Sequence, residues 1–217
     1  MFVIVLGAPG VGKGTQANLL SQAFTIPHIS TGDILRDAYK NQTQLGIEAH
    51  RLISKGNFVP DELVIGIIKE TLLEDRCTNG VVLDGFPRTL PQAKTLDALF
   101  IELNTKDLFL VNLTVGDEEI IRRLTSRRTC HDCHSVFSLL EIEDAGKCPI
   151  CGGENSLFHR SDDTEEVIKK RMGIFETQTL PVIHYYDETR TLITVDGAQT
   201  IANVYQDIIT KINATKL

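Results

Sequence analysis

The chain has 217 residues, 42% of them hydrophobic and 24% charged, a balance typical of a globular α/β protein with room for inserted subdomains. The formal net charge of −7 excludes a protein that mainly coats nucleic acid, because such a domain is expected to be basic. No segment approaches the roughly 18 apolar residues of a membrane span, and the uncharged start makes no signal peptide, so we expect a cytoplasmic monomer.

The first predicted element is a strand over residues 2–6, an apolar, β-branched run that ends in glycine. The segment that follows, from Gly7 to Thr15, matches a phosphate-binding loop through Gly7, Gly12 and Lys13. Its glycines let backbone N–H groups surround an anion, the next helix adds its positive end, and Lys13 adds a point charge. An ordinary glycine-rich turn is the alternative, and the loop alone predicts only that a nucleotide phosphate binds.

Helical patterns follow the loop over residues 15–23, 34–40, 45–55 and 62–74. Asp61 precedes the last of these helices and is an expected N-cap. Residues 30–59 form a helical insertion between a second strand and this helix. A further apolar strand over residues 81–84 ends on Asp84. That acid would lie at the carboxyl edge of the sheet beside the phosphate loop, where it can hold Mg²⁺ through waters; a solvated turn residue is the alternative.

The second half of the chain continues the alternation with a helix over residues 91–103, a strand over 108–113 and a helix over 117–125. Residues 126–163 interrupt it, because they carry few helical signals, three glycines and both cysteine pairs. We interpret this stretch as a small inserted subdomain.

A long helix is predicted over residues 165–186, with Asp163 and Glu166 as a capping box and Pro181 as the point where the helix bends or ends. A strand over 192–195 and a helix over 201–212 complete the chain. The whole pattern predicts an α/β fold with a parallel sheet covered on both faces, built from core segments 1–29, 60–125 and 164–217.

The cysteines form two Cys-x-x-Cys pairs, Cys130 with Cys133 and Cys148 with Cys151, while Cys77 stands alone. In a cytosolic chain this spacing indicates metal rather than disulfides, and four thiolates suit a tetrahedral structural Zn²⁺ site. A closed shell leaves no open position for catalysis. The histidines within and beside the first pair could replace a cysteine, and iron could replace zinc.

The blocks from Gly7 to Thr15, from His28 to Asp33 and from Leu83 to Thr89 together resemble adenylate kinase along essentially the whole chain. The resemblance implies a P-loop nucleoside-monophosphate kinase fold and reversible, Mg²⁺-dependent phosphoryl transfer in which ATP and AMP give two ADP. The cysteine pairs look like the long-lid bacterial form. By resemblance, residues 30–59 are therefore an AMP-binding insertion and residues 126–163 a zinc-binding lid.

The AMP site implied by the resemblance places Thr31 and Gln92 at the adenine and arginines at the phosphate. The full set is Thr31, Arg36, Asn57, Phe58, Val59, Gly85, Phe86, Pro87, Arg88, Gln92, Arg160 and Arg171. Other interpretations stay open for some members. Thr31 could be only a helix cap, Gln92 could complete a capping box with Thr89, and Arg160 and Arg171 could form surface ion pairs with the acids of residues 162–166.

The ATP site implied in the same way comprises Gly10, Val11, Gly12, Lys13, Gly14, Thr15, Arg123, Arg127, Val136, Phe137 and Gln199. The chain departs from the usual motifs in two places. Gly14 stands where phosphate loops generally have Ser or Thr, and Phe137-Ser138 stands where the family commonly has Tyr-His. Arg123 and Arg127 are four residues apart, so we expect them to share one helical face.

Phosphoryl transfer is catalysed mainly by positioning and positive charge, since charge spreads over the oxygens of the moving group. An AMP phosphate oxygen is already ionised at neutral pH, so no general base is required. The expected catalytic set is Lys13, Arg88, Arg127, Arg160 and Arg171. The alternatives are a kinase for another nucleoside monophosphate or a small alcohol, and a zinc-ribbon nucleic-acid-binding protein with an ATPase core.

Overall fold

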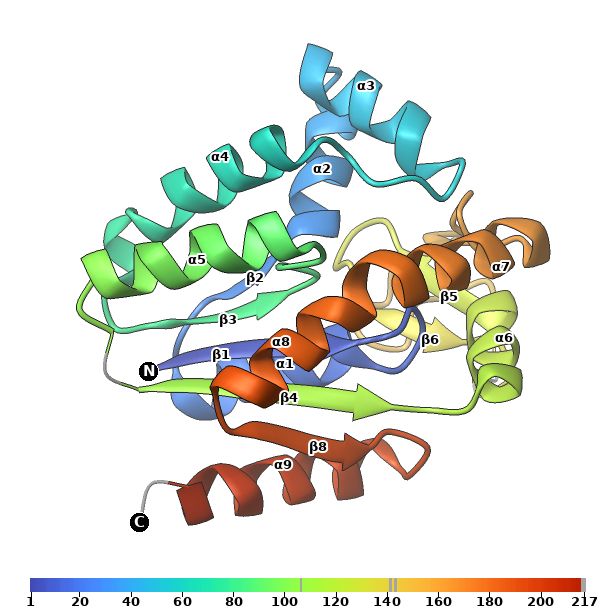
Figure 1. The fold of residues 1–217 in the computed structure, drawn as a ribbon. Coiled ribbons are helices and arrows are strands. Elements are labelled where there is room, and N and C mark those ends of the chain that lie inside the picture. The colour runs from blue at the N-terminus through green and yellow to red at the C-terminus, as the bar shows by residue number, and fades with distance from the viewer. Residues whose placement is uncertain (106, 141, 143, 216–217) are drawn as a thin grey trace.

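The computed structural model describes residues 1–105, 107–140, 142 and 144–215. Its centre is a parallel sheet of five strands in the order β2-β3-β1-β4-β8 (Figure 1). The strands are β1 (Phe2–Gly7), β2 (His28–Ser30), β3 (Val81–Asp84), β4 (Leu108–Thr114) and β8 (Leu192–Asp196). The predicted parallel sheet is confirmed. The sequence has no apolar run at strand β2, because only Ile29 of the strand's three residues is buried.

Helices cover both faces of this sheet. Ile4 and Leu6 of β1 lie in the core that also contains α4 (Asp61–Leu72), α5 (Leu90–Glu102) and α8 (Leu180–Thr189). Val3 and Val5 lie in the opposite core, with α1 (Lys13–Phe24), α6 (Asp117–Ser126) and α9 (Ile201–Thr215). Each fully buried aliphatic side chain contributes roughly 1.5–3 kcal/mol. The two cores therefore hold the carboxyl ends of β1 and β3 side by side, where Val5 is paired with Asp84.

Two helices, α2 (Thr31–Lys40) and α3 (Gln44–Ile53), form a pair beyond the carboxyl edge of the sheet (Figure 1). A Cβ atom at Gly46 would lie 2.1 Å from the backbone carbon of Ala38, so glycine is what allows this close approach. The ring of Tyr39 stacks on that of His50 with centroids 3.8 Å apart. These contacts join α2 and α3 into one unit.

A second, antiparallel sheet lies within the stretch that interrupts the α/β alternation. Its order is β6-β5-β7, with β5 (Arg127–Cys130), β6 (Val136–Ser138) and β7 (Leu157–Phe158). None of these strands was predicted, because each is two to four residues long and two of them carry polar residues.

The helix predicted over residues 165–186 is divided into α7 (Glu165–Ile174), the π-helical η2 (Phe175–Thr179) and α8. The helical conformation continues through residues 165–189, because Thr179 and Leu180 keep helical backbone angles. The helix therefore does not end at Pro181, and the irregularity expected there is the π-helical turn η2 just before the proline, which has no N–H group to donate. One turn of 3-10 helix, η1 (Asp75–Cys77), follows α4. No helix among the described residues is both long and apolar enough to cross a membrane.

Both predicted acidic caps are wrong. The N-cap of α4 is Pro60 and that of α7 is Thr164, and neither makes a side-chain cap hydrogen bond. Asp61 instead accepts hydrogen bonds from two side chains of the α5 region, and Asp163 pairs with Arg127. Asp163 gains a charged, bidentate guanidinium partner that a backbone N–H cannot match, and Asp61 gains two side-chain donors, one for each of its oxygens.

Candidate active site

The phosphate loop joins β1 to α1, as predicted. Gly7, Gly10 and Gly12 have φ angles of 133°, 82° and 102°, which L-residues with a Cβ rarely adopt. Lys13 begins α1, and its Nζ donates to the carbonyls of Gly7 at 2.9 Å and Ala8 at 2.8 Å. Burial lowers the pKa of Lys13 to about 7 against the opposing effect of Asp84. The Lys13 ammonium is therefore poorly hydrated, and a bound phosphate would stabilise its positive charge.

Asp84 ends β3 beside this loop. Its Oδ2 lies 3.6 Å from Nε2 of His28, which is buried and makes no hydrogen bond among the described residues. Burial alone would raise the pKa of Asp84, but His28 and Lys13 hold it below its ordinary value. A Cβ at Gly14 would stand 3.2 Å from Asp84 Oδ2. The glycine at position 14 therefore leaves room for water or a hydrated cation in front of an ionised carboxylate, which fits the oxygen ligands of Mg²⁺.

One cavity at the carboxyl edge is lined by residues of the phosphate loop, α2, α5, α7 and the loop after β3. It collects ten of the twelve residues expected at the AMP site: Thr31, Arg36, Asn57, Phe58, Val59, Gly85, Pro87, Arg88, Gln92 and Arg171. Lys13 and Asp162 line it as well. Phe86 does not, because its side chain is buried in the core, so only its backbone could face a ligand. Arg160 is also outside the lining.

Arg88 lies in this cavity with its guanidinium 5.4 Å from the centre of the Phe58 ring, a cation–π contact. Its Nε donates to the Gly85 carbonyl at 2.7 Å. Burial, followed by the charge of Arg171, lowers the pKa of Arg88 to about 10. Even so, Arg88 stays protonated at neutral pH, and its other guanidinium nitrogens remain available to an anion.

The alternatives left open for two AMP-site residues are resolved as follows. Ser30, not Thr31, caps α2, because its hydroxyl accepts from the N–H of Asp33, while Thr31 Oγ1 donates to the Gly85 carbonyl at 3.0 Å. The cap interpretation of Thr31 is therefore wrong. Gln92 does contribute its N–H to the Thr89 cap, but its side chain bonds elsewhere and lines the cavity.

The arginines of the second half are paired with carboxylates. Arg127 donates to Asp163 at 2.7 Å, and Arg171 lies 2.8 Å from Asp162 and 3.3 Å from Asp163. The two acids are 6% and 1% exposed, so these ion pairs are not the surface pairs considered from the sequence. Burial is the main factor lowering the pKa of Arg171, although Asp162 opposes it. The acids thus hold two guanidinium groups close to the cavity.

Within the part of the chain that the structure describes, Arg160 makes no such pair; its Nε donates to Thr129 Oγ1 at 2.9 Å. Burial, helped by Arg127 and Arg36, lowers the pKa of Arg160 to about 9. A set of cations that depress one another's pKa is the arrangement that an anionic ligand would stabilise.

The expectation that Arg123 and Arg127 share a helical face is wrong, because α6 ends at Ser126 and Arg127 begins β5. Arg123 pairs with Glu119 on α6 at 2.7 Å. It does not line the cavity, and of the eleven residues expected at the ATP site only Lys13 does. Val136 and Phe137 lie on β6. Gln199 follows β8, and its amide donates to Asp207 at 2.9 Å.

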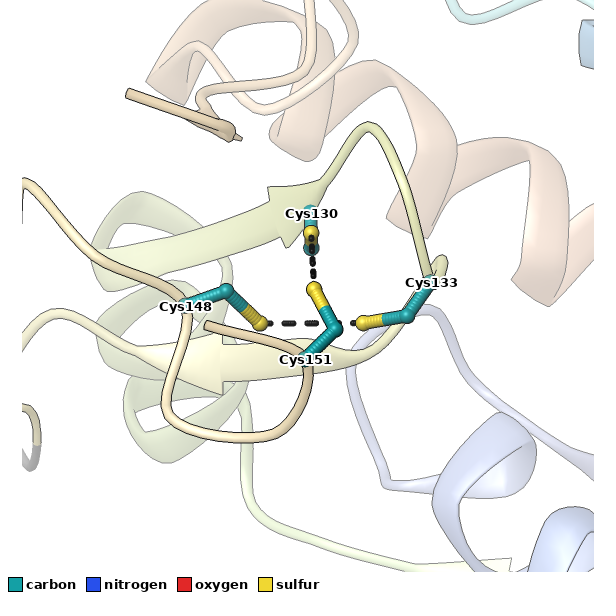
Figure 2. Close-up of side chains that lie close together, drawn as sticks. All are labelled: Cys130, Cys133, Cys148 and Cys151. Carbon is teal, nitrogen blue, oxygen red and sulfur yellow. Dashed lines mark hydrogen bonds between the residues drawn. The ribbon is translucent and has the colours of Figure 1, made fainter. Parts of the chain in front are cut away.

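The four cysteines of the two pairs converge on one point (Figure 2). Their sulfur atoms all lie within 4.8 Å of one another, and the Cys130–Cys151 and Cys133–Cys148 sulfurs are 3.6 Å apart. Burial opposes ionisation of Cys130, but hydrogen bonding, led by Ser156, lowers its pKa to about 6. Four convergent thiol ligands of this kind fit a tetrahedral Zn²⁺ ion.

Neither His131 nor His134, the two histidines within and beside the first cysteine pair, joins the cysteine group among the described residues. The ring of His131 stacks on Phe158 with centroids 3.9 Å apart, and His134 occupies a turn with φ of 59°. Cys77 is buried in the core with Ile68 and Leu72, and burial raises the pKa of its thiol.

Three acids have roles that sequence reasoning missed. Asp162 and Asp163 had been considered only as surface partners or caps, although two adjacent acids between Arg160 and α7 could have indicated an internal ion-pair group. Asp61 had been assigned only a helix cap. No sequence signal pointed to its contact with Gln92, because the two residues are 31 positions apart.

Comparison with known proteins gives a consistent result. A family model described as adenylate kinase matches residues 5–191. A protein of Caldicellulosiruptor saccharolyticus called adenylate kinase is 46% identical over 211 residues, which cover 96% of this chain and 97% of that protein. Proteins of the same name from Archaeoglobus fulgidus and Clostridium botulinum are 46% and 47% identical over 210 and 212 residues, with 96% of each chain covered.

Proposed function

The chain belongs to the adenylate kinase family, and we propose that the cavity at the carboxyl edge of its sheet is where ATP and AMP meet. The protein is a nucleoside-monophosphate kinase that transfers a phosphoryl group between ATP and AMP. The observation that carries the assignment of this site is the group of cations around Lys13. Arg88, Arg171 and Arg127 all lower the pKa of that lysine, so all four charges act on one small region.

Each of these residues has a distinct part in the proposed mechanism. Lys13 and the N–H groups of the loop from Gly10 to Thr15 hold the outer phosphates of ATP. Arg88 and Arg36 hold the AMP phosphate, and the ring of Phe58 keeps the Arg88 guanidinium in place. Arg127, Arg160 and Arg171, together with Arg88, stabilise the charge that develops on the transferred group. No base is needed, because the attacking AMP oxygen is already ionised, and transfer is direct and in line.

Mg²⁺ bound with ATP supplies further positive charge to the phosphates, and Asp84 is the residue proposed to hold it through water. Asp84 suits this role because its pKa is held below the ordinary value, its side chain is only partly buried and Gly14 leaves the space in front of it open.

The direct test is a coupled assay for ADP formed from ATP and AMP in the presence of Mg²⁺. Purified protein should form two ADP for each AMP consumed. The same assay with other monophosphates and with small alcohols should give much lower turnover, and equal turnover of an alcohol would contradict the assignment.

We further propose the division suggested by the sequence, with residues 30–59 closing on AMP and residues 126–163 closing on ATP as a zinc-held lid. The small sheet β6-β5-β7 and the cysteine group support the second unit, and the joined helices α2 and α3 support the first. On this basis Arg123, Val136, Phe137 and Gln199, which lie outside the cavity, are proposed to contact ATP only when the lid has closed. We also propose that the enzyme works as a monomer in the cytoplasm.

Lid motion is expected to limit turnover. A closed lid excludes water, which would otherwise compete with AMP for the phosphoryl group, and lid opening is often slower than chemistry. The rate of ADP formation in a single turnover, measured by rapid quench, should therefore exceed the steady-state rate. Equal rates would show that chemistry itself is limiting.

ATP affinity is expected to fall as pH rises above 7. The pKa of Lys13 is lowered to about 7 by burial, and Asp84, Arg88, Arg171 and Arg127 are the charged groups that act on it. Bound phosphates favour the ammonium, so above pH 7 binding must take up a proton, and affinity falls by up to about tenfold for each further pH unit.

Calorimetry at pH 8 in two buffers of different ionisation enthalpy measures this proton uptake directly. Lys13→Arg is the matched control, because arginine stays charged throughout this range and its uptake should be near zero. Equal uptake by both proteins would rule out Lys13 as the titrating group.

A further inference from the structure

The side chain of Gln92 makes two hydrogen bonds at the wall of the proposed AMP site. Its Nε2 donates to Asp61 Oδ1 at 2.7 Å, and its Oε1 accepts from the backbone N–H of Arg88 at 2.7 Å. Gln92 is 2% exposed and lines the cavity. The bonds join the start of α4, the loop after β3 and the start of α5 through one amide.

These partners allow only one orientation of the amide. A carboxylate such as Asp61 can only accept, and a backbone N–H can only donate. If the amide turned over, its oxygen would face the Asp61 carboxylate and its NH₂ would face the N–H of Arg88. Asp61 is itself held in place, because Thr89 Oγ1 donates to its other oxygen at 2.7 Å. The orientation of Gln92 therefore follows from the chemistry of its neighbours.

A primary amide has two N–H donors and two acceptor positions on its oxygen. Within the described residues Gln92 uses one of each, which leaves one donor and one acceptor for a ligand. The edge of adenine offers an acceptor at N1 and a donor at its 6-amino group. A 6-oxopurine offers the reverse, a donor at N1 and an acceptor at O6. A freely turning amide could match either base, but an amide held in one orientation matches only one of them.

We propose that Asp61 is a positioning residue that sets base specificity, because it holds the Gln92 amide in the orientation that matches a 6-aminopurine and opposes a 6-oxopurine. This inference rests on the proposed function, in which Gln92 contacts the base of the monophosphate. The phosphate of that nucleotide is held by arginines, so its base meets Gln92 in one position. A 6-oxopurine would then leave a donor facing a donor and an acceptor facing an acceptor, at a buried site where unmade bonds are costly.

The substitution Asp61→Asn tests this role with little change in shape. The asparagine amide can itself turn over, so it can either accept from Gln92 or donate to it. Position 61 then no longer requires the NH₂ group of Gln92 to face it. The N–H of Arg88 still favours the original orientation from the other side of the Gln92 amide. AMP and inosine monophosphate differ only at the 6-position and in the N1 proton, which makes them the matched substrates. The ratio of kcat/KM for inosine monophosphate to that for AMP should rise about tenfold. The KM for ATP should stay the same.

Glu62→Gln is the control for the change of charge, since Glu62 is the exposed neighbour of Asp61 in the first turn of α4. In Glu62→Gln, the ratio of kcat/KM for inosine monophosphate to that for AMP should equal the ratio in the unmodified protein. Asp61→Asn should also leave the ratio unchanged when Gln92 is already alanine, because Asp61 acts through that amide. Thermal melting of each variant separates loss of fold from loss of specificity.

Two results would overturn the inference: an unchanged ratio in Asp61→Asn, or the same rise in the Gln92→Ala background. Neither result would affect the proposed function. That function fails by a different result, namely an unmodified protein that forms no ADP from ATP and AMP.

Discussion

Replacement of Arg88 by alanine is expected to lower kcat by about a hundredfold or more, the loss found when a donor aimed at developing charge is removed. The Arg88 guanidinium lies in the cavity, over the ring of Phe58 and bonded to the Gly85 carbonyl. The backbone N–H that holds Gln92 is retained in the variant, so the base contact should survive. The loss should therefore appear mainly in kcat, measured by the coupled ADP assay.

Two further variants make this result specific. Arg88→Lys keeps the charge but not the planar, bidentate fork, and should recover only part of the rate. Arg76→Ala removes an exposed arginine that pairs with Glu74 outside the cavity, and should leave kcat unchanged. An Arg88→Ala protein that is folded by thermal melting and turns over within a few-fold of normal would remove Arg88 from the catalytic set.

Removal of metal from the cysteine group is expected to lower the free energy of unfolding by a few kcal/mol. Because a protein of this size loses about 2–4 °C in melting temperature for each kcal/mol, the melting temperature should fall by about 10 °C. Without the ion, the four cysteine ligands, whose sulfur atoms lie within 4.8 Å of one another, are no longer joined through a common metal centre. ATP affinity, measured with Mg²⁺ restored, should persist. Lys13 and its loop join β1 to α1 and do not belong to the cysteine-containing stretch of residues 126–163. A zinc-selective chelator and differential scanning calorimetry provide the measurement.

Single substitutions extend this test to the individual ligands. Cys148→Ser should lower both the zinc content and the melting temperature, whereas Cys77→Ala, which changes a thiol in the core, should leave the zinc content unchanged. If the protein as purified contains no metal and its melting temperature does not respond to chelation, the structural-zinc proposal is wrong.

The fold was predictable from the sequence where burial imposes a pattern. The strands β1, β3 and β4 are apolar runs because both faces of the sheet are covered there, whereas the edge strand β8 alternates between buried and exposed residues. The positions of all four agree with the predicted ones to within a residue. The strands β2, β5, β6 and β7 are short and partly exposed, so no run of apolar residues marks them. Their positions depend on pairing with segments distant in the sequence.

The site was predictable where one local motif carries the chemistry. The loop at Lys13, the turn at Arg88 and the cysteine pairs each combine a residue type with a fixed spacing. The partners of those residues were not predictable in this way. Asp61 was expected to cap its own helix, yet it bonds Gln92, a partner 31 positions away that only the packing of α4 against α5 brings within reach.

The pairing of Asp162 and Asp163 with Arg127 and Arg171 has a consequence for which anions can enter the site. The two carboxylates are internal counter-ions, so an anionic ligand must compete with them for these guanidinium groups. Asp163 bonds two nitrogens of Arg127 at once, whereas a chloride ion has one charge and no pair of oxygens to match that geometry. A nucleotide phosphate carries more charge on closely spaced oxygens and can compete for them. We therefore expect the resting ion pairs to favour polyvalent anions over simple salt.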